Sequence, residues 1–221
     1  MDTFPRLLLD HAARRPDAPA LREKAYGVWQ TLSWSQLAGL VRELALGLSA
    51  AGLRRGEHVV VVGENRPRLY ASMLAAQALG AVPVPLYQDA VAAEFVFPLN
   101  NAEIAFAIVE DQEQVDKLLE LREQCPQLKC IWFDDPRGLR NYQDAGLASL
   151  DVLQDDGRVH AASHHGFFEA QVRGALRAGE PLGMSSRFSR VVQDPATLDP
   201  HIYDAATDFN VIVALFESLT S

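Results

Sequence analysis

The sequence has few of the features that mark secreted or membrane-spanning proteins. Its 221 residues include only two cysteines, and no apolar stretch approaches the length needed to cross a bilayer. The N-terminal segment holds three consecutive leucines but no small-residue cleavage site, so it does not resemble a secretory signal. Two cysteines in such a chain are typical of a reducing compartment. We therefore expect a cytoplasmic protein without a transmembrane segment.

Positive charge is also scarce. The chain has 20 lysines and arginines against 29 aspartates and glutamates, which gives a net charge of −9 and a pI of about 5.1. Nucleic acids and anionic membrane surfaces are bound through a basic field. The composition therefore predicts no nucleic-acid partner.

The common glycine-rich phosphate motifs are missing as well. Neither G-x-x-x-x-G-K-[ST] nor G-x-G-x-x-G occurs, and the serine pair Ser185–Ser186 has no accompanying glycines or lysine. Loops of this kind hold phosphates with backbone N–H groups at the start of a helix. We therefore assign no catalytic and no cofactor-binding residue to this chain.

A continuous β-α-β unit is predicted over Leu53–Asp89. The apolar run Val59–Val62 is β-branched and lacks polar alternation, which favours a strand buried on both faces of a parallel sheet. Pro67 stands where a first helical turn accepts proline, and Gly80 stands where a C-cap glycine is expected. Apolar residues recur between them at helical spacing. Two prolines then alternate with apolar residues over 82–86, which predicts a short strand near a sheet edge.

Strands and helices alternate along the first two thirds of the chain. Ser33 followed by Gln36 has the spacing of a capping box and opens a predicted helix. An extended segment over 20–32 precedes it. The predicted strands are 59–62, 82–86, 105–109 and 129–133, and the predicted helices are 4–14, 34–51, 67–79 and 112–124. This alternation predicts an α/β fold in which helices cover a parallel sheet.

The sequence of the β-α-β unit resembles that of a known family, the adenylate-forming long-chain fatty acyl-CoA synthetases. Their N-terminal part has a G-[DE]-x-V strand, then E-N, a helix, and G-A-V-x-V-P-[LI]-Y. The resemblance extends over about residues 4–178 and implies the N-terminal subdomain of such a ligase. The matching residues here are Gly56, Glu57, Val59, Glu64, Asn65, Gly80, Ala81, Val82, Pro85, Leu86 and Tyr87.

The resemblance implies an activity that belongs to the complete family enzyme. That enzyme uses ATP and Mg to adenylate a fatty acid and then forms a thioester with CoA. Its Ser/Thr/Gly-rich phosphate loop, T-S-G-T-T-G-x-P-K, should follow Gly179, where this chain reads EPLGMSSRFSRVVQD instead. The catalytic lysine of its C-terminal domain has no counterpart either. We therefore expect a truncated and inactive ligase fragment that takes no cofactor of its own.

The last part of the chain has a different resemblance. Residues 188–221 resemble the start of a peptide- or nickel-type solute-binding protein of ABC importers, through P-x-T-L-D-P-H at Pro195–His201 and L-F-E-S-L at Leu215–Leu219. An unrelated C-terminal helix is the alternative. The expected domains are a ligase-like subdomain over 1–153, a linker with one helix over 154–187, and a foreign-looking tail over 188–221.

Several residue groups resemble metal or ligand sites but have simpler interpretations. His160, His164 and His165 are bracketed by glycines and suggest a solvated loop. Cys125 and Cys130 are five apart, beyond the usual zinc spacing, and suggest one surface and one strand cysteine. Asp134–Asp135 suggests a turn, and Glu110–Asp111 suggests helix capping. No metal site is assigned.

Aromatic and basic residues give the remaining candidates. Trp29, Trp34, Tyr70 and Tyr87 could form an acyl-binding wall, but core packing is the default interpretation. Four arginines near one strand are expected to be solvated and to bind no ligand; they are Arg54, Arg55, Arg66 and Arg68.

Three functional hypotheses follow from these observations. The first is the inactive ligase fragment with an accidental tail, and the second is a non-catalytic protein-interaction module. The third is an acyl-binding protein without chemistry. In the first case an apolar face should be left open, because the family's later subdomains would cover it, and self-association is expected.

Overall fold

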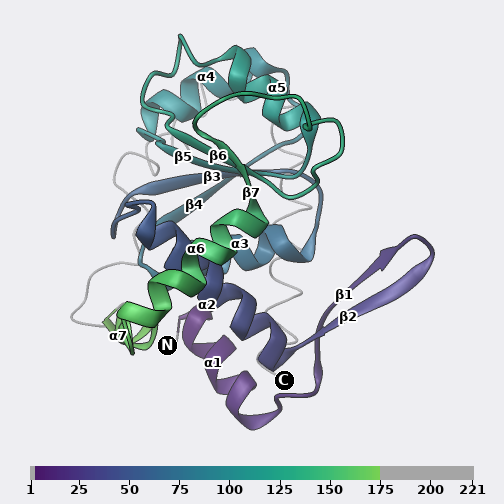
Figure 1. Ribbon diagram of the computed structural model, residues 1–221, viewed down its shortest axis with the longest axis vertical. Coiled ribbons are helices and arrows are strands. Elements are labelled where there is room, and N and C mark those ends of the chain that lie inside the picture. Colours follow the sequence, from purple (N-terminus) through teal and green to yellow (C-terminus); the bar gives the residue numbers. More distant parts are fainter. Residues whose placement is uncertain (1–2, 175–221) are drawn as a thin grey trace, which may run out of the picture. The chain divides into compact units, whose positions relative to one another are not determined.

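The computed structural model describes residues 3–174, shown as the coloured ribbon in Figure 1. All of them belong to one compact unit. The tail expected at 188–221 and the last part of the expected linker, residues 175–187, lie outside the described residues.

A five-stranded parallel sheet forms the centre of this unit. Its spatial order is β4-β3-β5-β6-β7, and every neighbouring pair is parallel. Val59–Val62 of the central strand are all buried, as a strand covered on both faces should be. The strands are β3 (His58–Val62), β4 (Val82–Leu86), β5 (Phe106–Val109), β6 (Cys130–Phe133) and β7 (Leu147–Ser149). The predicted α/β class is confirmed.

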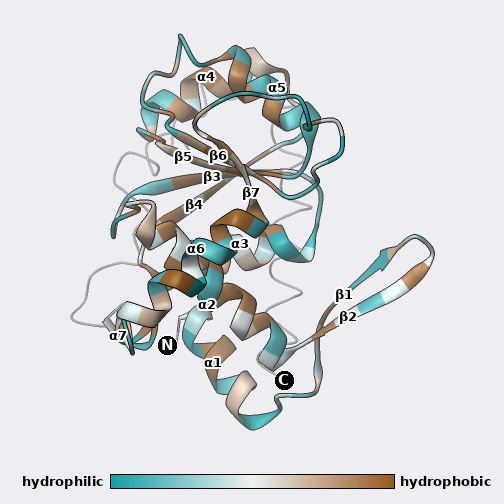
Figure 2. Cartoon of the chain, viewed as in Figure 1, coloured by the Kyte–Doolittle hydropathy of each residue, from teal (hydrophilic) through white to brown (hydrophobic). Residues whose placement is uncertain are grey.

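Helices cover both faces of the sheet (Figure 1). On one face lie α4 (Ala92–Asn101) and α5 (Gln112–Glu120). On the other lie α2 (Trp34–Ala50), α3 (Pro67–Ala78) and α6 (Leu150–Ser163), and beyond them α1 (Phe4–Arg14) and α7 (Phe167–Gly174). Figure 2 shows the strands and the sheet-facing sides of the helices as the most hydrophobic parts. No helix among the described residues is long and apolar enough to cross a membrane.

Local sequence signals explain where most helices begin. The Ser33 hydroxyl accepts a hydrogen bond from the Gln36 amide, and the Gln36 side chain accepts one from the Ser33 amide, so the predicted capping box starts α2. Pro67 stands in the first turn of α3, and Gly80 follows that helix with φ of 75°. These predictions are confirmed.

Helices α2 and α6 touch through their backbones. A Cβ atom at Gly47 would lie 2.1 Å from the carbonyl oxygen of Leu153, and one at Gly157 would lie 2.0 Å from that of Glu43. Side chains larger than hydrogen cannot fit there. The two glycines therefore allow α6 to lie directly on α2.

A β-hairpin leaves the body of the unit (Figure 1). It consists of β1 (Pro19–Ala25) and β2 (Val28–Ser33), which pair antiparallel and form a separate two-stranded sheet. The turn residues Tyr26 and Gly27 have φ of 50° and 80°. Positive φ at both central positions is the type I′ geometry that matches the twist of a hairpin.

Several features differ from the sequence-based expectation, among them strand β7 and helix α6, which were not expected. Helix α4 was not expected, because Pro98 lies inside it and no side chain caps its start. Helix α5 ends at Glu120 and not at 124, and turns follow it. The boundary expected between 153 and 154 falls inside α6, which packs on α2 as part of the same unit.

We expect Gly47→Ala to lower the free energy of unfolding by about 2 to 3 kcal/mol, because the new methyl group meets a backbone carbonyl that cannot move alone. Gly39→Ala is the matched control in the same helix, since nothing lies within 4 Å of a Cβ there. That variant should gain about 0.5 to 1 kcal/mol from better helix propensity. Urea unfolding followed by circular dichroism measures both, and equal effects would refute the close contact.

Candidate functional site

The carboxyl end of the parallel sheet is the first place to look for a site. In doubly wound sheets, ligands bind outside the carboxyl ends of the strands, where the strand order reverses. Here the order reverses between β3 and β5, because the chain goes from β3 to β4 on one side and then to β5 on the other. The residues at this point are Gly63 and Glu64 after β3, and Glu110 after β5.

The Glu110 side chain fills this position. One of its carboxylate oxygens accepts a hydrogen bond from the backbone N–H of Glu64. The other accepts one from Nε of Arg66, with 2.8 Å between the nitrogen and the oxygen. A Cβ atom at Gly63 would lie 2.5 Å from the Cβ of Glu110, so only glycine fits beside it. The side chain of Glu110 is only 12% exposed. The crevice between β3 and β5 is thus closed by an ion pair.

Arg66 is surrounded by carboxylates. Besides Glu110, its guanidinium lies 3.2 Å from Glu64 and 4.0 Å from Glu23 of the hairpin. The hydrogen bond to Glu110 raises the pKa of Arg66, against the opposing effect of burial. Three carboxylates around one cation leave a local excess of negative charge. This local negative charge would repel a phosphate group.

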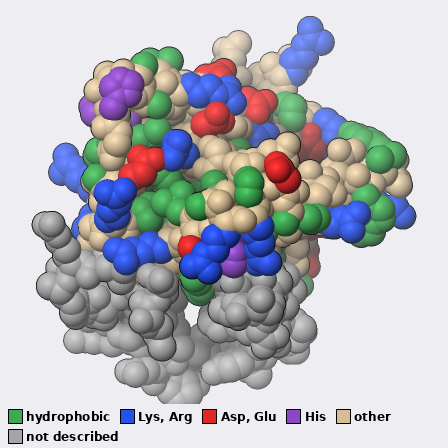
Figure 3. Space-filling view, turned by 90° about the horizontal axis from the view of Figure 1, so that it is seen from below, with side chains coloured by type: hydrophobic (Ala, Val, Ile, Leu, Met, Phe, Trp, Pro, Cys, Tyr) green, Lys and Arg blue, Asp and Glu red, His purple; other side chains and the backbone are tan. Residues whose placement is uncertain are grey.

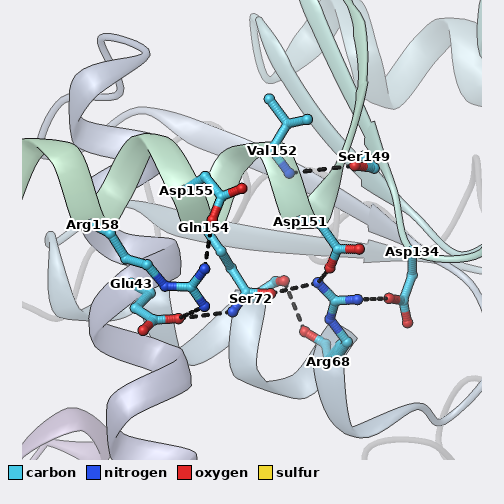
Figure 4. Close-up of polar contacts among 10 residues, drawn as sticks. All are labelled: Glu43, Arg68, Ser72, Asp134, Ser149, Asp151, Val152, Gln154, Asp155 and Arg158. Atoms are coloured by element: carbon cyan, nitrogen blue, oxygen red, sulfur yellow. Dashed lines mark hydrogen bonds and ion pairs between the residues drawn. The ribbon is translucent and has the colours of Figure 1, made fainter.

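A second arginine joins the end of β6 to two helices, as Figure 4 shows. The Arg68 guanidinium of α3 lies 2.9 Å from Asp134 and 2.7 Å from Asp151, and it donates to Gln154. Burial raises the pKa of Asp134, while the charge of Arg68 opposes this rise. The arginine satisfies a half-buried carboxylate that would otherwise be costly to ionise.

The same network continues onto α2 (Figure 4). Glu43 accepts hydrogen bonds from Gln154 and Arg158, both at 2.9 Å, and Arg158 also contacts Asp155. Burial raises the pKa of Glu43, but the hydrogen bonds from Arg158 and Gln154 outweigh it, and the net shift is downward. The network joins α2, α3 and α6 through side chains that are paired with one another.

The expectation that the arginines near β3 are merely solvated was wrong for three of the four. Arg66 and Arg68 hold the ion pairs described above. Arg55 donates to Gln171 of α7, and its side chain packs on Gly80. The pairs Arg66–Glu110, Arg68–Asp151 and Arg55–Gln171 join residues 44, 83 and 116 positions apart in the sequence. Opposite charges that follow neighbouring strands in the sequence were the signal from which these pairings could have been predicted.

The residues considered as metal ligands do not come together in the described part of the chain. The expected loop was wrong for His160, which lies in the last turn of α6. Its ring stacks on that of His164 at 3.8 Å, and Ser163 lies at hydrogen-bond distance from His164. Within residues 3–174 no three histidine, cysteine, aspartate or glutamate side chains come together in a way that could hold a metal.

The other paired residues have structural roles. Asp111 caps α5 by accepting the Gln114 amide, as predicted. Asp135 accepts the backbone N–H of Arg137, which fits the predicted turn, and the hydrogen bonds from Arg137 lower the pKa of Asp135. Both cysteines are free. The surface position expected for Cys125 was wrong, since that residue is buried, whereas Cys130 lies in β6 as predicted.

The four aromatic residues do not form an acyl-binding wall. Trp34 is buried and its ring lies 4.7 Å from that of His11. Trp29 and Tyr87 are more than half exposed, so the default of core packing was wrong for them. Tyr70 donates its hydroxyl to Asn65. The four side chains thus differ widely in exposure and partners.

Sequence comparison relates the chain to acyl-CoA ligases. The chain is 27% identical over 163 residues to the long-chain fatty acid–CoA ligase FadD15 of Mycobacterium tuberculosis. The matched region covers 72% of this chain and 27% of the ligase. It is 30% identical over 117 residues to the mouse long-chain fatty acid–CoA ligase ACSBG2, of which it covers 18%. It thus spans about a quarter or less of these ligases.

A shorter relative also matches. "Uncharacterized protein Rv1549" of M. tuberculosis is 36% identical over 107 residues, which make up 48% of this chain and 59% of that protein.

Solved structures show the same fold. Acetoacetyl-CoA synthetase from Streptomyces lividans superposes with a TM-score of 0.61 at 24% identity, over 68% of this chain and 24% of the synthetase. The N-terminal domain of FACL13 from M. tuberculosis gives 0.55 at 23% identity, over 72% of this chain and 36% of that one. At these identities the likeness concerns the fold alone.

The family assignment rests on the sequence match. The model of the AMP-binding enzyme family matches residues 8–166, well over half of the chain. The chain therefore belongs to the AMP-binding enzyme family and is homologous to the N-terminal region of long-chain fatty acid–CoA ligases.

Proposed function

We propose that these 221 residues form a structural, non-adenylating part of a long-chain fatty acid–CoA ligase architecture. The observation that carries the proposal is the closed crevice between β3 and β5, where Glu110 and Arg66 occupy the position that a sheet of this order offers to a ligand.

The electrostatics of the carboxyl edge support this proposal. The segments that directly follow β3, β5 and β6 read Gly-Glu-Asn, Glu-Asp and Asp-Asp-Pro. None of them offers the run of glycine N–H groups that cradles phosphates. The carboxylates there are already paired with Arg66, Arg68 and Arg137. An ATP molecule would bring four negative charges to an edge without a free cation among the residues described above.

A second candidate function is a stand-alone interaction module. The shorter M. tuberculosis relative favours it, because 107 matched residues already make up 59% of that protein. A chain of that size has room for little beyond the subdomain described here. Both candidates exclude autonomous adenylation, so the same first experiment applies to them.

We expect no ATP–pyrophosphate exchange when the purified chain is incubated with Mg·ATP, palmitate and labelled pyrophosphate. The exchange reports formation of the acyl adenylate, for which stabilised phosphates are essential. FadD15 of M. tuberculosis serves as the positive control in the same buffer. Exchange that rises in proportion to the concentration of this chain would overturn the proposal.

The third hypothesis, acyl binding without chemistry, leads to a separate prediction. Because Trp29 and Tyr87 are more than half exposed and Trp34 is buried, an acyl chain laid against the exposed rings would stay mostly in water. We expect isothermal titration with palmitate, kept below its micelle concentration, to give no saturable heat. A saturable 1:1 isotherm would instead favour an acyl-binding protein.

A further inference from the structure

The edges of the sheets differ in how well they are protected. An exposed strand edge invites pairing with another strand, and proteins guard such edges with proline, charge or short strands. The amide of Val82 donates toward the β3 side, to the carbonyl of Glu57. The alternate residues Pro83 and Pro85 therefore face away from the sheet, and neither has an N–H to offer. The other outer strand, β7, has only three residues.

In the hairpin, one strand carries residues that hinder pairing at its outer edge, and the other strand carries none. Strand β1 contains Pro19 and three charged residues, Arg22, Glu23 and Lys24. Strand β2 reads Val-Trp-Gln-Thr-Leu-Ser, with no charge and no proline, and its first four residues are exposed. Among the described residues no third strand pairs with it. Of these sheet edges, the outer edge of β2 alone lacks protection.

The turn determines which backbone groups of β2 face outward. A two-residue type I′ turn at Tyr26–Gly27 makes Ala25 and Val28 a hydrogen-bonded pair. Hydrogen-bonded and non-hydrogen-bonded pairs then alternate along the hairpin. Trp29, opposite Lys24, and Thr31, opposite Arg22, occupy the non-hydrogen-bonded positions. Their N–H and C=O groups therefore point away from β1.

We propose that β2 pairs with β2 of a second copy of this chain, antiparallel and across a two-fold axis at Gln30. Trp29 then lies opposite Thr31 of the other copy, and Val28 lies opposite Leu32. Because Trp29 and Thr31 both present outward backbone groups, this register forms four hydrogen bonds between the copies. It is the pattern that an antiparallel ladder requires.

The side chains suit this arrangement. Aromatic residues opposite β-branched ones stabilise a sheet, and no charged residue of β2 meets a like charge. The pairing turns a two-stranded hairpin into a four-stranded sheet, β1-β2-β2-β1. A lone two-stranded hairpin is marginally stable in water, whereas three or more strands gain cooperative support.

The hairpin is also accessible. It projects from the body of the unit in Figure 1, and in Figure 3 it is the arm at the right, with hydrophobic and Lys or Arg side chains at its end. Tyr26 is 95% exposed, and Val28 and Trp29 are each 60% exposed. Pairing of two hairpins buries only a small surface area, so the dimer should be weak and its population should depend on protein concentration. The proposal does not rest on the proposed function, since pairing at β2 and absence of adenylation are measured separately.

Sedimentation velocity of the full chain tests the proposal with one proline on each strand. Thr31→Pro removes an outward N–H at the paired edge without removing a backbone hydrogen bond to β1; it does remove the side-chain hydrogen bond that Arg22 Nε of β1 donates to Thr31 Oγ1. In the symmetric dimer it deletes two of the four hydrogen bonds between the copies. We expect its dimer dissociation constant to rise at least about tenfold.

Lys24→Pro is the matched control, because it alters an outward N–H on the opposite edge and should leave dimerisation unchanged. Circular dichroism verifies that both variants stay folded. A wild-type chain that stays monomeric up to about 100 μM, far above the micromolar constants of weak interfaces, would overturn the proposal. So would equal effects of the two prolines.

Gln30→Cys gives a second test that leaves the hairpin intact. Residues facing each other across the axis in a non-hydrogen-bonded pair have Cα atoms about 4.5 Å apart, within disulfide range. With diamide as the oxidant, we expect a covalent dimer on non-reducing gels. Lys24→Cys and the wild-type chain, which has its own Cys125 and Cys130, serve as controls and should stay monomeric. Equal cross-linking of Gln30→Cys and Lys24→Cys would contradict the register.

Discussion

The backbone contact between α2 and α6 sets the arrangement of one whole face of the sheet. Gly47 and Gly157 bring the two helices so close that any side chain at either position meets a carbonyl oxygen. At this separation Gln154 of α6 comes within hydrogen-bond distance of both Glu43 and Arg68. A steric constraint thus brings together a polar network that holds α2, α3 and α6 and reaches the end of β6 through Asp134.

The charges at the carboxyl edge serve the fold. Glu110 and Asp134 follow neighbouring strands, where a nucleotide-binding sheet would present glycines and free N–H groups. In this chain each of these carboxylates is paired with an arginine of the β3–α3 connection or of α3 itself. Pairing satisfies half-buried carboxylates that would otherwise be costly to ionise. The family relationship therefore identifies the architecture, and the charges at this edge stabilise it.

The edges of the two sheets have different consequences. The five-stranded sheet ends in a proline-bearing strand and a three-residue strand, so its growth is blocked at both sides. The hairpin sheet has only two strands, and its second strand carries no guarding residue. Two strands bury too little to be stable alone. The association at β2 that we propose would pair this open edge.

Local sequence patterns determined most of the secondary structure and the fold class. The run Val59–Val62, the capping box at Ser33–Gln36 and the glycine at Gly80 each act within a few residues, so their effects follow from the sequence alone. The match to the ligase family likewise follows from the order of such motifs.

Only the tertiary structure decided which charges meet. Arg66 and Glu110 are 44 residues apart, and Arg68 and Asp151 are 83 apart. Whether such groups touch depends on the order of the parallel strands and on how closely α6 approaches α2. Burial of Cys125 and formation of α4 around Pro98 depend in the same way on packing. Local propensity carries no information about distant partners, so these features could not be predicted from the sequence.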